Sequence, residues 1–181
     1  MLEPLTDDLA PRPPALGPIA HLLLNTSKLW AAAGGLLFVG LVAMSIVSIV
    51  GRKLFSAPVP GDVEVLQMVA ASAGASFFAY CHMNQGDVKV DFFTAKAGER
   101  TVHRLDAAGS LLFASVGALL TWRTGAGALA TMNTGETSAI LGWSVGLAQW
   151  AMVPGFVLMA LAGLAMTDWH WRQAAGAGSA P

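Results

Sequence analysis

Long uncharged stretches alternate along the chain with short segments that hold nearly all of its charges. These stretches cover residues 29–51, 65–86, 107–122 and 137–167, the last with an apolar centre at about 145–166. A helix needs about 20 apolar residues, each rising about 1.5 Å, to cross a bilayer core about 30 Å thick. The pattern therefore predicts an all-α integral membrane protein with four transmembrane helices, at about 29–51, 65–85, 105–123 and 143–167.

The composition agrees with a membrane protein and disfavours a soluble enzyme. Of the 181 residues, 55% are hydrophobic and 12% are charged, whereas soluble domains have about 25% charged residues. The net charge of −1 gives no attraction to a nucleic-acid backbone. A single cysteine, Cys81, excludes an internal disulfide, a cysteine-rich zinc site and a CxxC redox pair. We therefore expect no enzyme activity and no nucleic-acid partner.

Residues 1–28 and 169–181 are expected to be cytoplasmic tails, the first largely disordered, on either side of a transmembrane domain at 29–168. The first 18 residues lack the basic start and apolar run of a cleavable signal peptide. Lysine and arginine concentrate on the cytoplasmic side of membrane proteins. Both termini are placed in the cytoplasm because most basic residues fall on their side of the predicted spans: Arg12, Lys28, Lys89, Lys96, Arg100, Arg104 and Arg172. The opposite side has Arg52, Lys53 and Arg123.

The predicted spans have no Asp, Glu, Lys, Arg or His at their centres. Proteins that move ions by themselves usually keep ionisable residues there, so we expect no catalytic, metal, cofactor or substrate-binding residue in this chain. Small residues recur instead, as at Ala71, Ala75 and Ala79, which are four residues apart. Such spacing favours close helix association, either between these helices or with another subunit.

The segment between the second and third spans is predicted to lie on the membrane surface. It mixes charged and apolar residues and contains Phe92-Phe93, a pattern typical of interfacial segments. Six residues are candidates for shaping this loop or meeting phospholipid head groups: Gly86, Lys89, Asp91, Lys96, Arg100 and Arg104. The basic residues can also serve only to set the topology, and the two interpretations are compatible.

Several short patterns together resemble the small membrane subunit of tripartite ATP-independent periplasmic (TRAP) transporters, the DctQ type. Arg52 and Phe55 follow the first span, and Pro58 or Pro60 precedes the acids that open the second, Asp62 and Glu64. The family's pattern after the second helix is matched by Gly86, Val88, Lys89, Val90 and Asp91. The resemblance covers roughly residues 30–168. Asp87 stands where the family often has a histidine, which puts in doubt any role that needs an imidazole there.

The resemblance implies a function that composition cannot show. TRAP systems combine a periplasmic substrate-binding protein, a large permease subunit and this small subunit in the bacterial inner membrane. They import organic acids such as dicarboxylates, keto acids or sialic acids, driven by a sodium gradient whose coupling site is expected in the large subunit. The small subunit would brace the large one and assist docking of the binding protein. Candidate contact residues are Arg52, Phe55, Asp62 and Glu64, although Arg52 and Glu64 can simply pair with each other.

Three alternatives remain open on the sequence. The chain can be an accessory four-helix anchor of another membrane complex, or a small exporter that works alone. It can also be a haem-binding subunit of a quinone oxidoreductase, which needs two histidines facing each other inside the bundle. The available histidines are His21, His82, His103 and His170.

Overall fold

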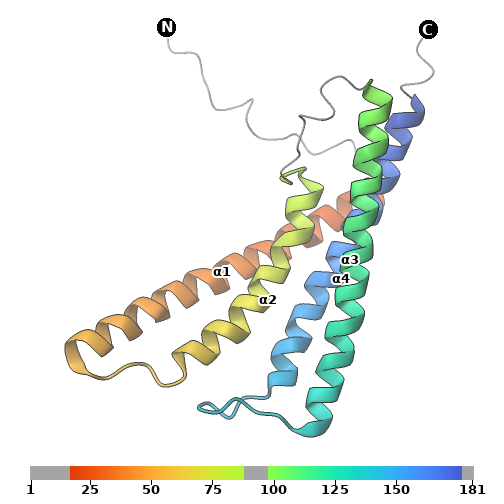
Figure 1. The fold of residues 1–181 in the computed structure, drawn as a ribbon. Helices are drawn as coiled ribbons and strands as arrows, with labels where there is room; N and C mark the ends of the chain where they lie inside the picture. The colour runs from red at the N-terminus through yellow and green to blue at the C-terminus, as the bar shows by residue number, and fades with distance from the viewer. Residues whose placement is uncertain (1–16, 88–97, 177–181) are drawn as a thin grey trace, which may run out of the picture.

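The computed structural model describes residues 17–87 and 98–176 and contains four helices in this part of the chain (Figure 1). They are α1 (Pro18–Phe55), α2 (Asp62–Met83), α3 (Glu99–Thr134) and α4 (Val145–Gly176). Each is long and apolar enough to cross a membrane. The prediction of an all-α membrane protein with four membrane helices is confirmed. The predicted surface segment between the second and third helices lies mostly outside the described residues.

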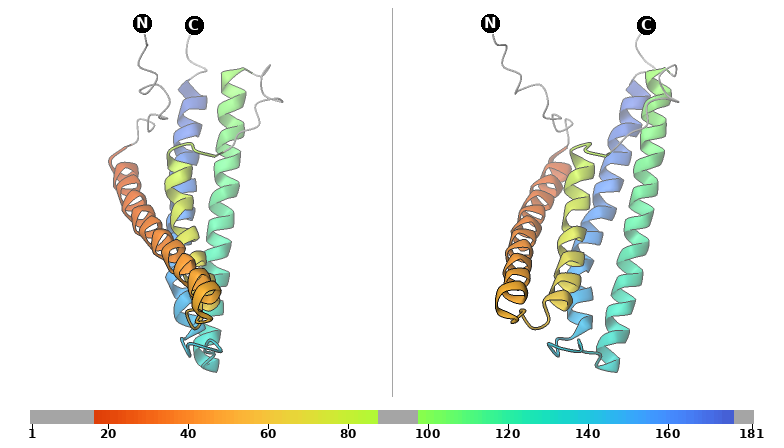
Figure 2. Two further views of the ribbon diagram at one scale, coloured as in Figure 1. Left: turned by 90° about the vertical axis from the view of Figure 1, so that its left-hand side faces the viewer. Right: turned by 60° about the vertical axis from the view of Figure 1, so that its left-hand side comes forward.

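The helices form an open row in the order α1, α2, α4, α3 (Figure 2). The helix α4 lies between α2 and α3 and has the most buried residues, whereas α1 packs mainly on α2. Within the described residues, α1 and α3 make no close backbone contact, nor do α2 and α3. The two edge helices therefore leave broad faces that no other described helix covers.

The first and last helices are longer than the spans predicted for them. Residues 18–28 were expected to belong to a disordered tail, but α1 already begins at Pro18. Proline suits the first turn of a helix, because the amide it lacks would have no partner there, and the apolar run Ile19–Leu24 follows except at His21. At the other end, α4 continues to Gly176. The helices therefore extend beyond the predicted spans, and the division into tails and a transmembrane domain stays a prediction.

The third helix does not end at Arg123, as the sequence suggested, but continues to Thr134. The extension has no charged residue, and it ends at Gly135, which takes the left-handed conformation that glycine favours (φ +69°). It packs on the start of α4, where Gly146 lies against Ala128 and Met132. Arg123 is therefore an exposed residue inside a long helix, and its charge does not mark the helix end.

Glycines bring α4 into backbone contact with both of its neighbours. A Cβ atom built on Gly155 would lie 2.6 Å from the carbonyl oxygen of Ala75 in α2. One built on Gly163 would lie 2.7 Å from the backbone nitrogen of Ala114 in α3. Real Cβ atoms do not approach backbone so closely. At these positions the small residues therefore serve packing within the chain, which was one of the two readings of the sequence.

The same kind of contact is made from α3 by Gly117, and it yields a prediction. A Cβ on Gly117 would meet the backbone nitrogen of Ala160 at 2.8 Å and its Cα at 3.0 Å. Gly117→Ala should therefore force α3 and α4 apart and cost about 1–3 kcal/mol of stability, seen as a lower unfolding temperature in detergent. The control is Gly125→Ala in the same helix, where a Cβ meets nothing within 4 Å. This control should be neutral or stabilising, because alanine favours helix more than glycine by about 1 kcal/mol. Equal losses in the two variants would contradict the packing account.

Candidate functional site

The turn between α1 and α2 is closed by the carboxylate of Asp62. Its Oδ2 pairs with Nη2 of Arg52 at 3.1 Å and also accepts a hydrogen bond from the hydroxyl of Ser48. The Ser48 oxygen in turn accepts the backbone N–H of Val59 at 3.3 Å. These bonds tie the last turns of α1 to the first turn of α2. We call Ser48, Arg52, Asp62 and Glu64 the turn cluster.

Glu64 joins the α1–α2 turn to the α3–α4 turn. Its two carboxylate oxygens accept the backbone N–H groups of Ile140 at 2.9 Å and Leu141 at 3.1 Å. Gly61 supports the same junction, because a Cβ there would lie 2.6 Å from Cγ of Leu141. The alternative that Arg52 pairs with Glu64 is wrong, because Arg52 pairs with Asp62.

The four residues predicted to contact partners therefore divide into two kinds. The carboxylates of Asp62 and Glu64 accept hydrogen bonds within the chain. Asp62 accepts from Ser48 of α1, and Glu64 accepts from the α3–α4 turn. The side chain of Arg52 stays 61% exposed despite its ion pair, and Phe55 is 75% exposed at the end of α1. The exposed arginine and the exposed aromatic ring give this end a surface that another protein can reach.

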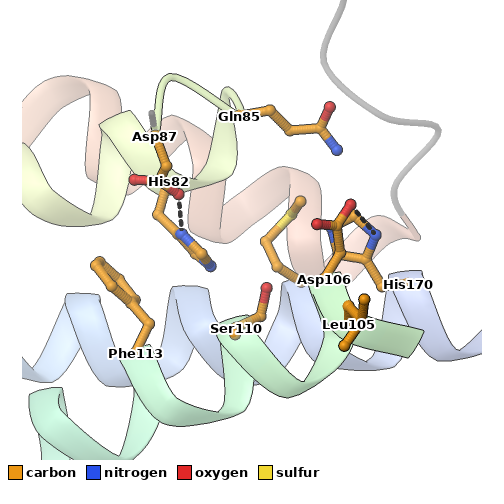
Figure 3. Close-up of a pocket in the computed structure, with 10 residues that line it drawn as sticks. His82, Gln85, Asp87, Leu105, Asp106, Ser110, Phe113 and His170 are labelled. Carbon is orange, nitrogen blue, oxygen red and sulfur yellow. Dashed lines mark hydrogen bonds and ion pairs between the residues drawn. The ribbon is translucent and has the colours of Figure 1, made fainter. Parts of the chain in front are cut away.

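A second polar site lies at the opposite ends of the helices, near the end of α2, the start of α3 and the end of α4. It was not predicted from the sequence. A cavity of about 350 Å³ opens there between α2, α3 and α4 (Figure 3). Nδ1 of His82 is paired with the carboxylate of Asp87. The His82 ring stacks on Phe113, with centroids 4.1 Å apart and planes at 15°. We call this cavity the histidine pocket. Its polar walls are His82, Gln85, Asp87, Asp106, Ser110 and His170.

The pocket also brings together residues that are far apart in the sequence. Asp106 of α3 lies 3.8 Å from His170 of α4, measured from Oδ2 to Nδ1 (Figure 3). His103, one turn before Asp106, joins them, and its ring centroid lies 5.9 Å from that of His170. From the sequence alone, these histidines were considered only as possible haem ligands. The spacing of His103 and Asp106 could have indicated that they share a helix face. His170 comes from another helix, so its approach to them could be seen only from the packing of α3 on α4.

The pairing of His82 with Asp87 bears on the family pattern. Asp87 stands where the family often has a histidine, and His82 lies five residues too early to replace it in sequence. The structure nevertheless brings the two side chains into contact, because the chain turns back after α2. An imidazole is therefore present beside this position, supplied by the last turn of the helix.

The residues predicted to shape the cytoplasmic loop are only partly described. The amide of Gly86 donates to the carbonyl of Cys81 at 2.9 Å and so helps to end α2. Arg100 and Arg104 are exposed on the first turns of α3, next to Trp171 of α4. Lys89, Asp91 and Lys96 lie outside the described residues. Contact of this segment with lipid head groups stays a prediction.

The role of Glu64 gives a direct test of the junction between the two turns. Glu64→Gln leaves a neutral amide with one acceptor oxygen in place of the two carboxylate oxygens, so one backbone N–H loses its partner. We expect the unfolding temperature in detergent to fall by several degrees. Glu136→Gln is the matched control, because this exposed carboxylate makes no hydrogen bond with the rest of the described chain. A loss of the same size in the control would contradict a specific role for Glu64.

Comparison with known proteins gives one clear result. The family model described as tripartite ATP-independent periplasmic transporters, DctQ component, matches residues 41–171, which is more than half of the chain. The matched range includes the turn cluster and the histidine pocket. No curated protein and no solved structure matches the chain. The chain therefore belongs to the DctQ component family and is a small membrane subunit of a TRAP transporter.

Proposed function

We propose that this subunit braces a large permease subunit in the bacterial inner membrane and helps to dock a periplasmic binding protein. The complete transporter would import an organic acid of the dicarboxylate, keto acid or sialic acid type, coupled to sodium in the large subunit. The observation that carries the proposal is the open row of helices in a chain of the DctQ family.

An open row leaves apolar faces that lipid or a protein partner must cover. The helix α1 is uncharged from residue 29 to residue 51, and it contacts α4 only weakly. Van der Waals packing, and not the hydrophobic effect, drives helix association within lipid, so a large flat face suits a second membrane protein. Exposed large apolar residues on α1 include Leu36, Leu37, Val39, Val42, Ile46, Val47 and Ile49.

The distribution of charge argues against a transport site within this chain alone. Ionisable side chains of the described residues gather near the two ends of the helices, with Arg123 of α3 as the exception. Sodium and proton coupling in membrane transporters use carboxylates or broken helices near the middle of the bilayer. Arg123 is a cation and cannot bind sodium. This charge pattern supports a bracing role for the subunit.

The orientation follows from the same charges. Lys28, Arg100, Arg104 and Arg172 lie toward the start of α1, the start of α3 and the end of α4, and basic residues favour the cytoplasmic side. The proposal places both termini in the cytoplasm and the turn cluster on the periplasmic side. Arg52 and Phe55 would then face the binding protein, while Arg100 and Arg104 would meet phospholipid head groups.

Reconstitution in liposomes tests the proposed division of labour. Liposomes with an inward sodium gradient and this chain alone should not accumulate any of a panel of dicarboxylates, keto acids and sialic acid. Liposomes that also contain the large permease, supplied with the binding protein, should accumulate one of them. Sodium-driven uptake by this chain alone would contradict the proposal and favour an independent transporter.

A charge reversal tests docking at the periplasmic end. Arg52→Glu should lower binding-protein-dependent uptake by roughly tenfold, because charges at an interface rim control the rate of association. The fold should persist, since an exposed ion pair contributes little to stability. The control is Lys53→Glu, the same charge change at the next residue of α1. Unchanged uptake for Arg52→Glu, or an equal loss in the control, would remove Arg52 from the docking surface.

A further inference from the structure

We propose that His103, Asp106 and His170 form a binding site for a divalent transition-metal ion of the zinc class, beside the histidine pocket. Each residue offers one ligand atom, and these three atoms lie within 4.8 Å of one another. Two imidazoles and a carboxylate form a ligand set that suits Zn²⁺ and its neighbours better than Mg²⁺ or Ca²⁺, which prefer oxygen ligands. This inference goes beyond the proposed transport function and does not depend on it.

The backbone places the three side chains on facing surfaces of two packed helices. His103 and Asp106 are three residues apart on α3, so they lie on the same face one turn apart. His170 comes from α4, and α3 and α4 pack along much of their length. The site is thus held by the most extensive helix contact in the described fold and needs no contribution from a loop.

The distances fit a metal site that tightens on binding. Two ligands bound to tetrahedral zinc at about 2.0–2.1 Å lie roughly 3.3 Å apart. The Asp106 and His170 atoms are 3.8 Å apart, which is longer than a hydrogen bond and needs about 0.5 Å of closure. The rings of His103 and His170 are tilted by 40° and do not stack face to face. Small side-chain rotations can therefore bring the three ligand atoms around one ion.

Burial supports a ligand at this place. Nδ1 of His103 is buried and has no hydrogen-bond partner among residues 17–87 and 98–176. A buried polar atom without a partner costs free energy, and coordination to a metal would satisfy it. The side chain of His170 is only 4% exposed. The Asp106 side chain is 23% exposed, so the site is closed at His170 and accessible to an ion beside Asp106.

The neighbouring wall of the pocket provides a second, independent indication. His82 is 7% exposed, and its Nε2 is buried without a hydrogen-bond partner in the described part of the chain. Its Nδ1 is held by the carboxylate of Asp87, which is the arrangement that orients metal-binding histidines in known sites. Figure 3 shows the His82 ring directed from Asp87 into the cavity that Asp106 and His170 also line. The cavity offers access for the ion and room for a fourth ligand.

A metal here would clamp α3 to α4 near the start of α3 and the end of α4. Small-residue packing, as at Gly163 and Ala114, also joins these two helices. Binding of an ion to the folded state alone stabilises that state in proportion to the logarithm of the free ion concentration. The metal would therefore act on the stability of the subunit, separately from substrate transport.

The test is zinc binding by the full chain, purified in detergent without a polyhistidine tag and stripped with a chelator. We expect about one bound Zn²⁺ per chain by elemental analysis, and a higher unfolding temperature with zinc. His103→Ala and His170→Asn should each weaken zinc binding by at least about a hundredfold. Loss of a residue that only supports a metal ligand lowers metal affinity by about 10–100-fold, and loss of the ligand itself should cost more. The control is His21→Ala, an exposed histidine of α1, which should bind zinc as the unchanged chain does.

Cobalt(II) provides a readout that is sensitive to the ligands themselves. The unchanged chain with Co²⁺ should show the visible absorption of a low-coordinate cobalt site, and Asp106→Asn should alter this absorption while the circular dichroism of the helices persists. The proposal is overturned if the unchanged chain binds less than stoichiometric zinc. It is also overturned if His103→Ala and His170→Asn, both folded by circular dichroism, bind as the unchanged chain does.

Discussion

The close approach of α4 to its two neighbours is the constraint on which the rest of the structure depends. Within lipid, helices gain little from burying apolar surface, so their association depends on tight van der Waals contact. Gly155 and Gly163 provide this contact by letting the backbones of α2 and α3 reach α4. A side chain at either position would meet main-chain atoms that cannot rotate away. The central place of α4 in the row follows from these two glycines on different faces of one helix.

An open row has consequences at its edges and at its ends. The edge helices keep apolar faces uncovered, and the turn cluster and the histidine pocket concentrate polar contacts at opposite ends. The turn cluster fixes how the two helix pairs meet, because Glu64 holds the α3–α4 turn against α2. The geometry thus combines a closely packed centre with two distinct polar surfaces. This combination suits a small membrane subunit of the DctQ family.

The sequence predicted the four helices and the family because both depend on local patterns. Uncharged runs define membrane helices directly, and short motifs near Arg52 and Gly86 carried the resemblance. The end of α3 was mispredicted because Arg123 interrupts the uncharged run, whereas the helix is extended by packing of Gly146 on Ala128. The partner of Arg52 and the meeting of His103 with His170 also escaped prediction. Each depends on how segments far apart in the sequence approach one another, which local sequence patterns do not show.

The most direct test of the account is to identify what covers the open row in the native membrane. The tagged chain would be isolated in mild detergent, and its bound proteins identified and quantified by mass spectrometry. The account predicts a large permease of the TRAP type in nearly equal amount. A stable oligomer of this chain alone, with no other membrane protein bound, would contradict the claim that the row is completed by a larger subunit.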